Sequence, residues 1–340
     1  MTAPLNELRR AFPSAEIQVL VSQTCAPVFV GHPFISKVWT FERHRDAASR
    51  ARSLAGLAIR LRRERFDTVV NFHASPSSAT LAFATGAPTR AIHFHGHKDR
   101  NRYSTVDVPG KGILKPIIER DMDSVRALGA HVSPGRLPEI KVLPGEKEEA
   151  QKRLAQMGLP TPVLAIGLGA SRSTKFWPFE RYALLAEKWC AQTGGSVIAL
   201  MSADEDQQGR EFLRCVEAQV AQAEVRRKIT IESGLDLRSL FALVGETAVL
   251  VGNDSGPRHI AVAVGTPTVT IFGPEDPFEW HPYPSERHPY FFAEGLPCRK
   301  DALPGYPAWC GLDTCVVEQH RCMREIGVDA VFGAAERISR

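Results

Sequence analysis

The sequence predicts an α/β protein made of two doubly wound domains in tandem. Short apolar segments of strand length alternate with amphipathic segments of helical length in both halves of the 340 residues. Such alternation is typical of a parallel sheet that helices cover on both faces. A stretch rich in proline and glycine, residues 133–145, separates the two halves. The length also favours two domains of ordinary size.

The first half contains two predicted strands, near Glu16–Val21 and Thr68–Phe72. The segment between them, about Asp46–Arg65, is predicted to be helical because apolar residues recur on one of its faces, at Leu54, Leu57, Ala58 and Leu61. A second helix is expected over Ile117–Leu128, and Gly129 ends it.

The second half shows the alternation more clearly. A charged helix is expected first, at Glu146–Met157. Five strands are predicted, near Val163–Leu168, Ser196–Met201, Lys228–Ile231, Ala248–Gly252 and Thr268–Phe272. Helices are predicted in the gaps, over Phe179–Cys190, Gln207–Gln222, Leu237–Val244 and Gly256–Val264. The end of the chain has the apolar spacing of an amphipathic helix.

We place the first domain at residues 1–145, the second at 146–325, and a C-terminal helix at 326–340. In parallel sheets of this kind, ligands bind beyond the carboxyl ends of the strands. We therefore expect the carboxyl ends of the strands in the two domains to face a cleft, and we expect the functional residues to lie at those ends.

Composition argues against several functional classes. Lys and Arg number 42 and Asp and Glu 38, so the net charge of +4 is too small to favour a nucleic-acid partner. No uncharged apolar run of about 18 residues predicts a transmembrane helix. The N-terminus carries Glu7, Arg9 and Arg10 where a signal peptide would need apolar residues. We therefore expect a cytoplasmic protein.

The segment VGNDSGPRHIAVAVGTPTVTIFGPEDP, residues 251–277, reads as strand, sharp turn, helix and strand. Asp254 or Ser255 is suited to cap the new helix, and Gly256 leaves room for a ligand beside the backbone. The free N–H groups of a helix start attract anions such as phosphate. His259 lies one turn further along the helix. An ordinary capped turn explains the same residues, so both interpretations stay open here.

A second polar loop, GLGASRSTKFWP, follows the first strand of this half. Ser171 and Thr174 offer hydroxyls, and Lys175 offers a compact positive charge that suits phosphate. The spacing fits neither a Walker loop nor the G-x-G-x-x-G fingerprint, which argues against a Rossmann dehydrogenase. Taken alone, Lys175 also fits a solvated loop lysine.

A third loop, MSADED, ends the next strand, and there Asp204 or Glu205 is placed to hydrogen-bond a ribose. The Asp-x-Asp pattern of this loop, repeated at Asp121–Asp123, also occurs in metal-dependent sugar transfer. Acidic helix starts are common, however, and they explain both matches. These three loops can bind anions or hydrogen-bond hydroxyls, and they lie at the same edge of the predicted sheet. Together they indicate a nucleotide-containing ligand more strongly than any one of them does alone.

Two segments carry a resemblance to a known family. VGNDSGPRHIAVAVGTPTVTIFGPEDPFEWHPY resembles the donor-binding motif of glycosyltransferase family nine, the ADP-heptose:lipopolysaccharide heptosyltransferases, and GASRSTKFWP resembles that family's earlier loop. The resemblance covers nearly the whole chain. It implies a GT-B fold of two Rossmann-like domains, with the nucleotide sugar on the C-terminal domain and the acceptor on the N-terminal one. It also implies inverting transfer without a metal ion.

Carried over by position, the resemblance assigns the phosphate-binding groups. Lys175 would pair with the diphosphate, and Ser171 and Thr174 would supply hydroxyls from the same loop. The backbone N–H groups of Ser255 and Gly256 would bind phosphate oxygens.

The resemblance also assigns the sugar and nucleoside contacts. Asp254 would contact the donor sugar, and His259 would support the phosphate site. Asp204 or Glu205 would approach the ribose, and Leu235 would lie near the base.

The N-terminus departs from the family pattern. Family members begin with a strand and a Gly-Asp loop whose Asp is the expected general base, whereas this chain opens at MTAPLNELRRAFP. The opening matches only the helix that follows that loop, and the first strand and the Asp loop are absent from it. Either the start codon is placed too late or the protein is truly shortened. A parallel sheet without a central strand has unpaired backbone groups and exposed apolar surface. Losing a base slows transfer by about 10²–10⁴-fold. His73 is our candidate substitute, although a structural or substrate-contact role also fits.

Arginine is concentrated between residues 43 and 65. Part of this set, Arg60, Arg62 and Arg63, falls on the polar side of the predicted helix. A solvated surface helix explains the pattern, and so does a patch that binds anionic lipid headgroups or a phosphorylated glycolipid core. Because the family's acceptor is such a lipid, we favour the patch.

Four cysteines gather near the C-terminus, at Cys298, Cys310, Cys315 and Cys322. Their gaps are loose for zinc, which usually shows at least one Cys pair with two to four residues between the two cysteines, and only Cys310 and Cys315 come near that spacing. We weigh a structural zinc ion against reduced thiols, and no cofactor is expected for catalysis.

The resulting hypothesis is a glycosyltransferase. It would move a heptose-like sugar from an ADP-sugar to a lipopolysaccharide core or other glycolipid acceptor, at the inner face of the cytoplasmic membrane. The alternative is a catalytically impaired nucleotide-sugar-binding or scaffold protein that has lost the base loop. The residues name neither the donor sugar nor the acceptor hydroxyl.

Overall fold

The structure is a computed structural model, and it describes residues 1–42, 46–73, 75–93, 102–108, 115–299, 310–316 and 320–339. The chain forms two compact units, Met1–Pro138 and Glu139–Arg340, which we call unit 1 and unit 2. Each is described by itself. No described helix is both long and apolar enough to cross a membrane.

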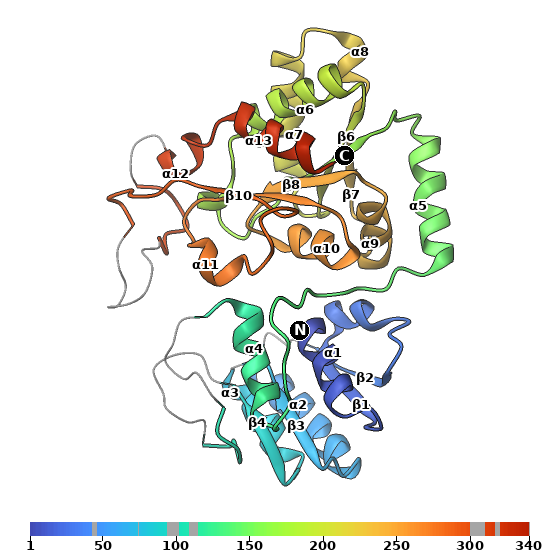
Figure 1. Cartoon of the computed structure of the whole chain (residues 1–340), viewed down its shortest axis with the longest axis vertical. Helices are drawn as coiled ribbons and strands as arrows, with labels where there is room; N and C mark the ends of the chain where they lie inside the picture. The colour runs from blue at the N-terminus through green and yellow to red at the C-terminus, as the bar shows by residue number, and fades with distance from the viewer. Residues whose placement is uncertain are drawn as a thin grey trace. The chain divides into compact units, whose positions relative to one another are not determined.

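Unit 1 begins with a helix and alternates short strands with helices (Figure 1). Its helices are α1 (Thr2–Ala11), α2 (Ala47–Arg63), α3 (Pro76–Ala84) and α4 (Ile117–Arg126), with a 3₁₀ segment η1 (Gln23–Phe29). Its strands are β1 (Ile17–Ser22), β2 (Ile35–Phe41), β3 (Thr68–Asn71) and β4 (Thr89–Ile92). The predicted strands near residues 16 and 68 and the two predicted helices are confirmed, whereas β2, β4 and α3 were not predicted.

The core of unit 1 lies under α2. Leu57 and Leu61 of this helix pack with Trp39 and Leu81, and they are 2% and 4% exposed. Leu54 and Ala58 are partly buried against the same cluster. The predicted apolar face of the helix is therefore confirmed.

The strands of unit 1 do not join into one sheet. β1 pairs with β2 and β3 pairs with β4, both in parallel, as two separate two-stranded sheets. Among the described residues no strand connects β1 to β3, and the first element is a helix.

Unit 2 contains a six-stranded parallel sheet. Its strands are β5 (Val163–Gly167), β6 (Ser196–Met201), β7 (Ile229–Ser233), β8 (Val249–Asn253), β9 (Thr268–Phe272) and β10 (Tyr290–Phe292). Its helices are α5 (Pro144–Gln156), α6 (Phe179–Thr193), α7 (Asp206–Gln219), α8 (Ala223–Arg226), α9 (Leu237–Gly245), α10 (Gly256–Val264), α11 (Pro277–Trp280), α12 (Arg321–Arg324) and α13 (Val328–Ile338), with a 3₁₀ turn η2 (Ser173–Lys175). All five strands predicted for this half are confirmed.

The strand order in this sheet is β10-β9-β8-β5-β6-β7. From β5 the chain builds outward through β6 and β7, and then it returns to add β8 on the other side of β5. The loops after β5 and β8 therefore leave in opposite directions. Such a topological switch point is where parallel α/β sheets bind ligands.

Helices cover both faces of the sheet (Figure 1). On one face Leu164 and Ile166 of β5 pack with the apolar sides of α6, α7 and α13. On the other, Val163 and Ala165 pack with α9 and α10. Alternate side chains of β5 point to opposite faces of the sheet, and both faces are buried. The sequence of this strand is therefore a continuous apolar run.

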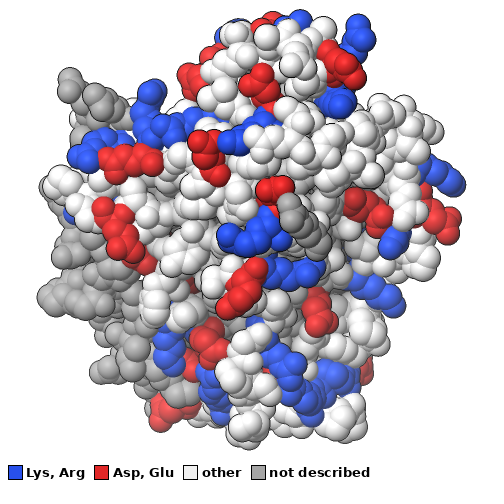
Figure 2. Space-filling model, turned by 45° about the horizontal axis from the view of Figure 1, so that its top comes forward, with Lys and Arg blue, Asp and Glu red and all other residues white. Residues whose placement is uncertain are grey.

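The surface in Figure 2 shows Lys and Arg side chains interspersed with Asp and Glu. Lys and Arg side chains gather along the lower edge of that face.

Candidate functional site

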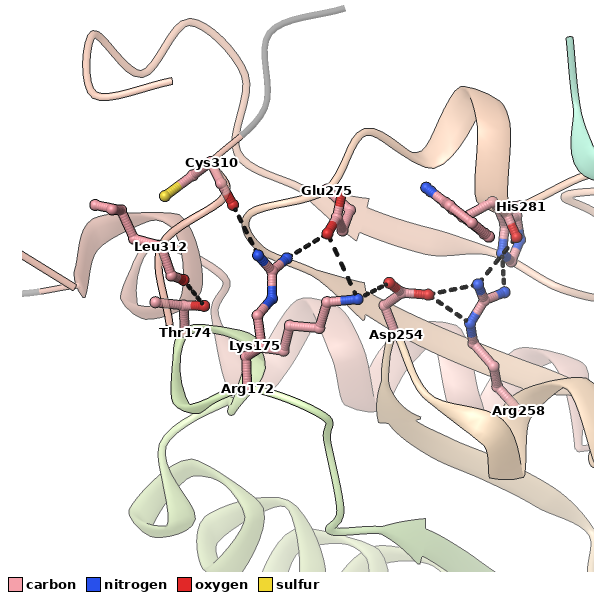
Figure 3. Close-up of polar contacts among 10 residues, drawn as sticks. Arg172, Thr174, Lys175, Asp254, Arg258, Glu275, His281, Cys310 and Leu312 are labelled. Carbon is pink, nitrogen blue, oxygen red and sulfur yellow. Dashed lines mark hydrogen bonds and ion pairs between the residues drawn. The ribbon is translucent and has the colours of Figure 1, made fainter. Parts of the chain in front are cut away.

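The loops after β5 and β8 meet at the switch point through an ion pair (Figure 3). Lys175 Nζ lies 2.7 Å from Asp254 Oδ2 and 3.8 Å from Glu275 Oε1. The lysine side chain is only 12% exposed. Lys175 is therefore not a solvated loop lysine, since the fold holds it against two carboxylates at the end of the sheet.

Charges alternate in sign along this site. Arg172 pairs with Glu275, Lys175 with Asp254, and Arg258 with Asp254 in turn (Figure 3). Three cations face two carboxylates, which makes the cluster a place for one further anion. An anion that enters has to compete with the two carboxylates for the cations.

Arg258 holds Asp254 from inside the protein. It is 1% exposed, and its Nη2 and Nε donate to Asp254 Oδ1 at 2.6 and 3.1 Å. Its Nη2 also donates to the carbonyl of Trp280 at 2.9 Å. Burial by itself would raise the pKa of Asp254, but Arg258 and Lys175 outweigh that effect and lower it below its ordinary value. Asp254 is therefore a carboxylate at neutral pH.

Asn253, the last residue of β8, joins the two loops. Its Oδ1 accepts from the Trp177 amide at 2.9 Å and from the Tyr182 hydroxyl at 3.0 Å, and its Nδ2 donates to the Leu168 carbonyl at 3.1 Å. All of these groups are buried, where an unmet hydrogen bond costs about 1–3 kcal/mol. Asn253 thus sets the position of the loop that carries Lys175.

The start of α10 is open to a ligand. The side chain of its N-cap residue, Ser255, makes no capping hydrogen bond, and the Asp254 carboxylate is held by Lys175 and Arg258. The expectation that one of these two residues caps the helix is therefore wrong. Apart from its chain neighbours and the backbone of its own helix, no atom of the described residues lies within 4 Å of where a Cβ of Gly256 would be. The N–H groups at the first turn are thus accessible to an anion.

His259 lies one turn into α10, partly exposed. Its Nδ1 is hydrogen-bonded to the hydroxyl of Tyr283. Burial and the positive charge of Arg258 lower the pKa of His259 well below 6.5, against a smaller opposite effect of Asp254. The imidazole is therefore neutral at neutral pH.

Of the two acidic residues predicted in the loop after β6, only Glu205 faces the candidate site. Glu205 accepts a hydrogen bond from the Ser202 amide at 2.8 Å, and its carboxylate lies where a Cβ of Gly169 would be. Glu205 thus faces the β5 loop, while Asp204 is fully exposed. Leu235, after β7, packs partly buried against the core cluster under α9 and α10.

The predicted hydroxyls of the β5 loop differ in their surroundings. Ser171 is exposed. Thr174 is 2% exposed, and its hydroxyl donates to the carbonyl of Leu312 at 2.8 Å (Figure 3). In this structure the Thr174 hydroxyl therefore holds the described segment 310–316 rather than facing the Lys175–Asp254 pair.

The remaining predicted residues lie in unit 1. His73 is exposed two residues after β3, and its backbone N–H donates to Asn71 Oδ1 at 2.9 Å. Arg60, Arg62 and Arg63 are exposed in the last turn of α2. There the negative end of the helix dipole also favours cations.

The four C-terminal cysteines form no metal site among the residues that the structure describes. Among the described residues, which include all four cysteines, no group of three or more His, Cys, Asp or Glu side chains is arranged to hold a metal ion. Burial lowers the pKa of the Arg299 guanidinium, against smaller opposite effects of Cys322, Cys298 and Cys310. Burial raises the pKa of Cys322 to about 11, despite the opposite effect of Arg299. The Cys322 thiol is therefore protonated at neutral pH in the metal-free protein.

Reasoning from the sequence missed five residues of this site, namely Arg172, Asn253, Arg258, Glu275 and Tyr283. Arg258 had a detectable signal, because it is the only charged residue in the helix GPRHIAVAV. A charge that is this isolated in an apolar helix has to be either exposed or paired. The other four gave no comparable local signal.

Known proteins resemble this chain over most of its length. The family model described as Glycosyltransferase family 9 (heptosyltransferase) matches residues 54–302. Among curated relatives, lipopolysaccharide heptosyltransferase 3 of Escherichia coli is 24% identical over 289 residues, covering 83% of this chain and 82% of that protein.

Solved structures show the same fold. A family 9 glycosyl transferase from Veillonella parvula has a TM-score of 0.75 at 21% identity, covering 99% of this chain and 92% of its own. The ADP-heptose lipopolysaccharide heptosyltransferase II of E. coli has a TM-score of 0.70 at 20% identity, with coverages of 99% and 93%. The predicted GT-B fold class is confirmed.

Proposed function

The chain belongs to glycosyltransferase family 9, and from that premise we propose that it transfers a heptose-like sugar from an ADP-sugar to a lipopolysaccharide core acceptor. The ion pair of Lys175 with Asp254 beside the uncapped start of α10 carries this proposal. The curated relative is named as a lipopolysaccharide heptosyltransferase, and one solved structure is named as an ADP-heptose enzyme.

The proposed reaction is a direct displacement with inversion. The acceptor hydroxyl attacks the anomeric carbon, its new C–O bond forms as the bond to the diphosphate breaks, and ADP leaves with the electron pair. Lys175 and the N–H groups at Gly256 stabilise the negative charge that grows on the diphosphate. These groups provide positive charge at the place where negative charge develops on the diphosphate. We therefore expect the reaction to need no metal ion.

For the sugar, the ribose and the base of the ADP-sugar, we propose the contacts that the family pattern implies. Asp254, oriented by Arg258, contacts the sugar. Glu205 is the better placed of the two acidic residues for the ribose, because it faces the β5 loop. Leu235 is proposed to lie near the base.

The acceptor proton needs a base, and His73 is our candidate in unit 1 because its imidazole is exposed after the end of β3. The alternative remains a protein that binds the nucleotide sugar without transferring it. Measuring binding and transfer separately distinguishes the two.

We further propose that the exposed arginines at the end of α2 contact the anionic headgroups of the acceptor lipid or of the inner-membrane surface. The exposure of Arg60, Arg62 and Arg63 supports this role.

Calorimetric titration with ADP and with ADP-heptose tests the donor site. We expect Lys175→Ala to weaken ADP binding by about 10–100-fold, the effect of losing a charge-assisted hydrogen bond. Lys147→Ala is the matched control, because Lys147 is 58% exposed on α5 and pairs with Glu246 at 3.5 Å. It should bind ADP as the unaltered protein does.

Release of ADP from ADP-heptose, with and without a heptose-deficient lipopolysaccharide acceptor, then tests transfer. Acceptor-dependent release supports the enzyme, whereas tight binding without release supports the alternative. A folded protein that binds neither ADP nor ADP-heptose would contradict the donor-site proposal.

A further inference from the structure

Two histidines at this end of the sheet use their ring nitrogens differently. His281 is held at both: Arg258 Nη1 approaches Nδ1 at 3.4 Å, and Nε2 lies 2.7 Å from the carbonyl oxygen of His288. A guanidinium only donates and a carbonyl only accepts, so the proton of His281 is on Nε2. His281 is therefore paired within the protein and has no ring nitrogen left for a ligand.

His259 is held at one nitrogen only. The hydroxyl of Tyr283 lies 2.5 Å from Nδ1, and the two rings meet edge to face with centroids 5.8 Å apart. In the part of the chain that the structure describes, no group hydrogen-bonds Nε2. His259 is also partly exposed on the first turns of α10, close to Gly256.

The direction of the bond between Tyr283 and His259 follows from the groups around it. Burial raises the pKa of Tyr283 to about 12, so the phenol keeps its proton. Apart from His259 Nδ1, no described protein group accepts that proton in a hydrogen bond. If Nδ1 were the donor, the phenol proton would therefore have no acceptor among the described groups. A phenol O–H is also a stronger acid than the N–H of a neutral imidazole, so the phenol is the better donor.

We propose that Tyr283 is a positioning residue that holds neutral His259 in the tautomer with its proton on Nε2, so that this N–H donates to a phosphate oxygen of the donor diphosphate at the start of α10. The inference rests on the proposed donor site. The other tautomer would point a lone pair at an anionic oxygen, which is repulsive. Since the imidazole is uncharged, its tautomer decides whether it attracts or repels the phosphate.

Tyr283→Phe tests this role, because it keeps the ring that packs against His259 and His281 and removes only the hydroxyl. Tyr290→Phe is the matched control, on a tyrosine that also packs against His281 but is 44% exposed. The first readout is the ¹⁵N NMR pattern of the histidine rings in the ligand-free protein, with His259→Gln used to assign the signal. We expect the Nε2–H pattern for His259 in the unaltered protein and in Tyr290→Phe, and a mixed or shifted pattern in Tyr283→Phe.

The second readout is ADP affinity by calorimetry. We expect Tyr283→Phe to bind about 5–10-fold more weakly and Tyr290→Phe to bind normally. His259→Gln, whose amide N–H reaches the position of Nε2, should retain more affinity than His259→Asn.

An Nδ1–H or charged pattern for His259 in the unaltered protein would overturn the inference. So would a Tyr283→Phe variant that matches the unaltered protein in both pattern and affinity. If the folded protein binds no ADP, the proposed function fails and the ligand role of His259 fails with it. In that case the NMR pattern still decides whether Tyr283 sets the tautomer.

Discussion

At the scale of single residues, Asp254 shows how tertiary contacts change the meaning of a local pattern. An Asp before a Ser and a Gly at a helix start is usually a cap. Here its carboxylate instead bridges Lys175 and Arg258, and the helix start is left open. The two cations keep Asp254 ionised and hold its carboxylate in place.

Gly256→Ala should separate ligand binding from folding. Among the described residues, no atom outside the neighbouring backbone lies within 4 Å of the new Cβ, and the backbone conformation does not require a glycine. The melting temperature should therefore stay the same or rise slightly. A phosphate at the N–H groups would meet the methyl group, so ADP affinity should fall by about 10-fold or more. Thermal melts and calorimetry provide the two measurements.

Gly333→Ala, on α13, is the control for this change, since its Cβ would also have no neighbour within 4 Å. It should leave ADP binding intact. Normal ADP affinity in Gly256→Ala would argue against a phosphate at the start of α10.

At the scale of elements, the site depends on two strands that are neighbours in space but distant in sequence. β5 and β8 pair directly, with Gly167 opposite Gly252. A Cβ on Gly252 would lie 3.1 Å from the carbonyl oxygen of Gly167, so a side chain there would push the strands apart. This close approach and the hydrogen bonds of Asn253 bring the two loops within ion-pair distance.

The exposed arginines at the end of helix α2 are proposed to bind anionic lipid surfaces. Arg60→Gln with Arg63→Gln should weaken co-sedimentation with anionic vesicles, by about 1 kcal/mol per charge or roughly 30-fold for the pair. Neutral vesicles should show no difference, and added salt should remove the effect.

Arg210→Gln with Arg214→Gln, two exposed arginines on α7, is the matched control. An equal loss of vesicle binding in both double variants would indicate a general charge effect and would count against a specific patch on α2.

At the scale of the whole molecule, the two units differ in how completely their sheets are built. Unit 2 has six strands in one sheet with helices on both faces, and unit 1 has two separate pairs of strands. The cluster of Lys175, Asp254 and the start of α10 lies entirely within unit 2. Donor binding is therefore expected to depend on the unit with the larger continuous core.

The stability of unit 2 should fall as the pH is lowered from about 6.5 toward 5. Burial lowers the pKa of His281 and of His288 to about 4, and that of His259 well below 6.5. In the unfolded chain these histidines are protonated as the pH falls through about 6.5. In the folded protein the same histidines are protonated only at a lower pH. Lower pH therefore favours the unfolded state, and the melting temperature should drop by about 5 °C or more.

His288→Asn should reduce the slope of melting temperature against pH, because it removes one of the three titrating groups. His131→Gln, at an exposed position of unit 1, should leave the slope unchanged. A melting temperature that is flat between pH 7.5 and 5 would show that these histidines are not held neutral by the fold.

The strands and helices of unit 2 were predictable, whereas several elements of unit 1 were not. A strand buried on both faces is a continuous apolar run, and β6 and β9 were predicted with the bounds that the structure shows. β2, with the sequence ISKVWTF, mixes exposed charged and polar residues with apolar ones, and β4 has only four residues. Such short or mixed strands form because of partners that lie elsewhere in the chain.

The site follows the same division. Lys175, Asp254 and Gly256 were identifiable one by one, because charge at a strand end and glycine at a helix start have local signatures. Local patterns of period and polarity also determine the alternation of strands and helices, since they depend on residues a few positions apart. That Lys175 and Asp254 are 2.7 Å apart, and that Arg258 is buried behind them, depends on the strand order that places β8 beside β5. Strand order is decided only when the whole sheet buries its apolar residues, so it has no counterpart in any short stretch of sequence.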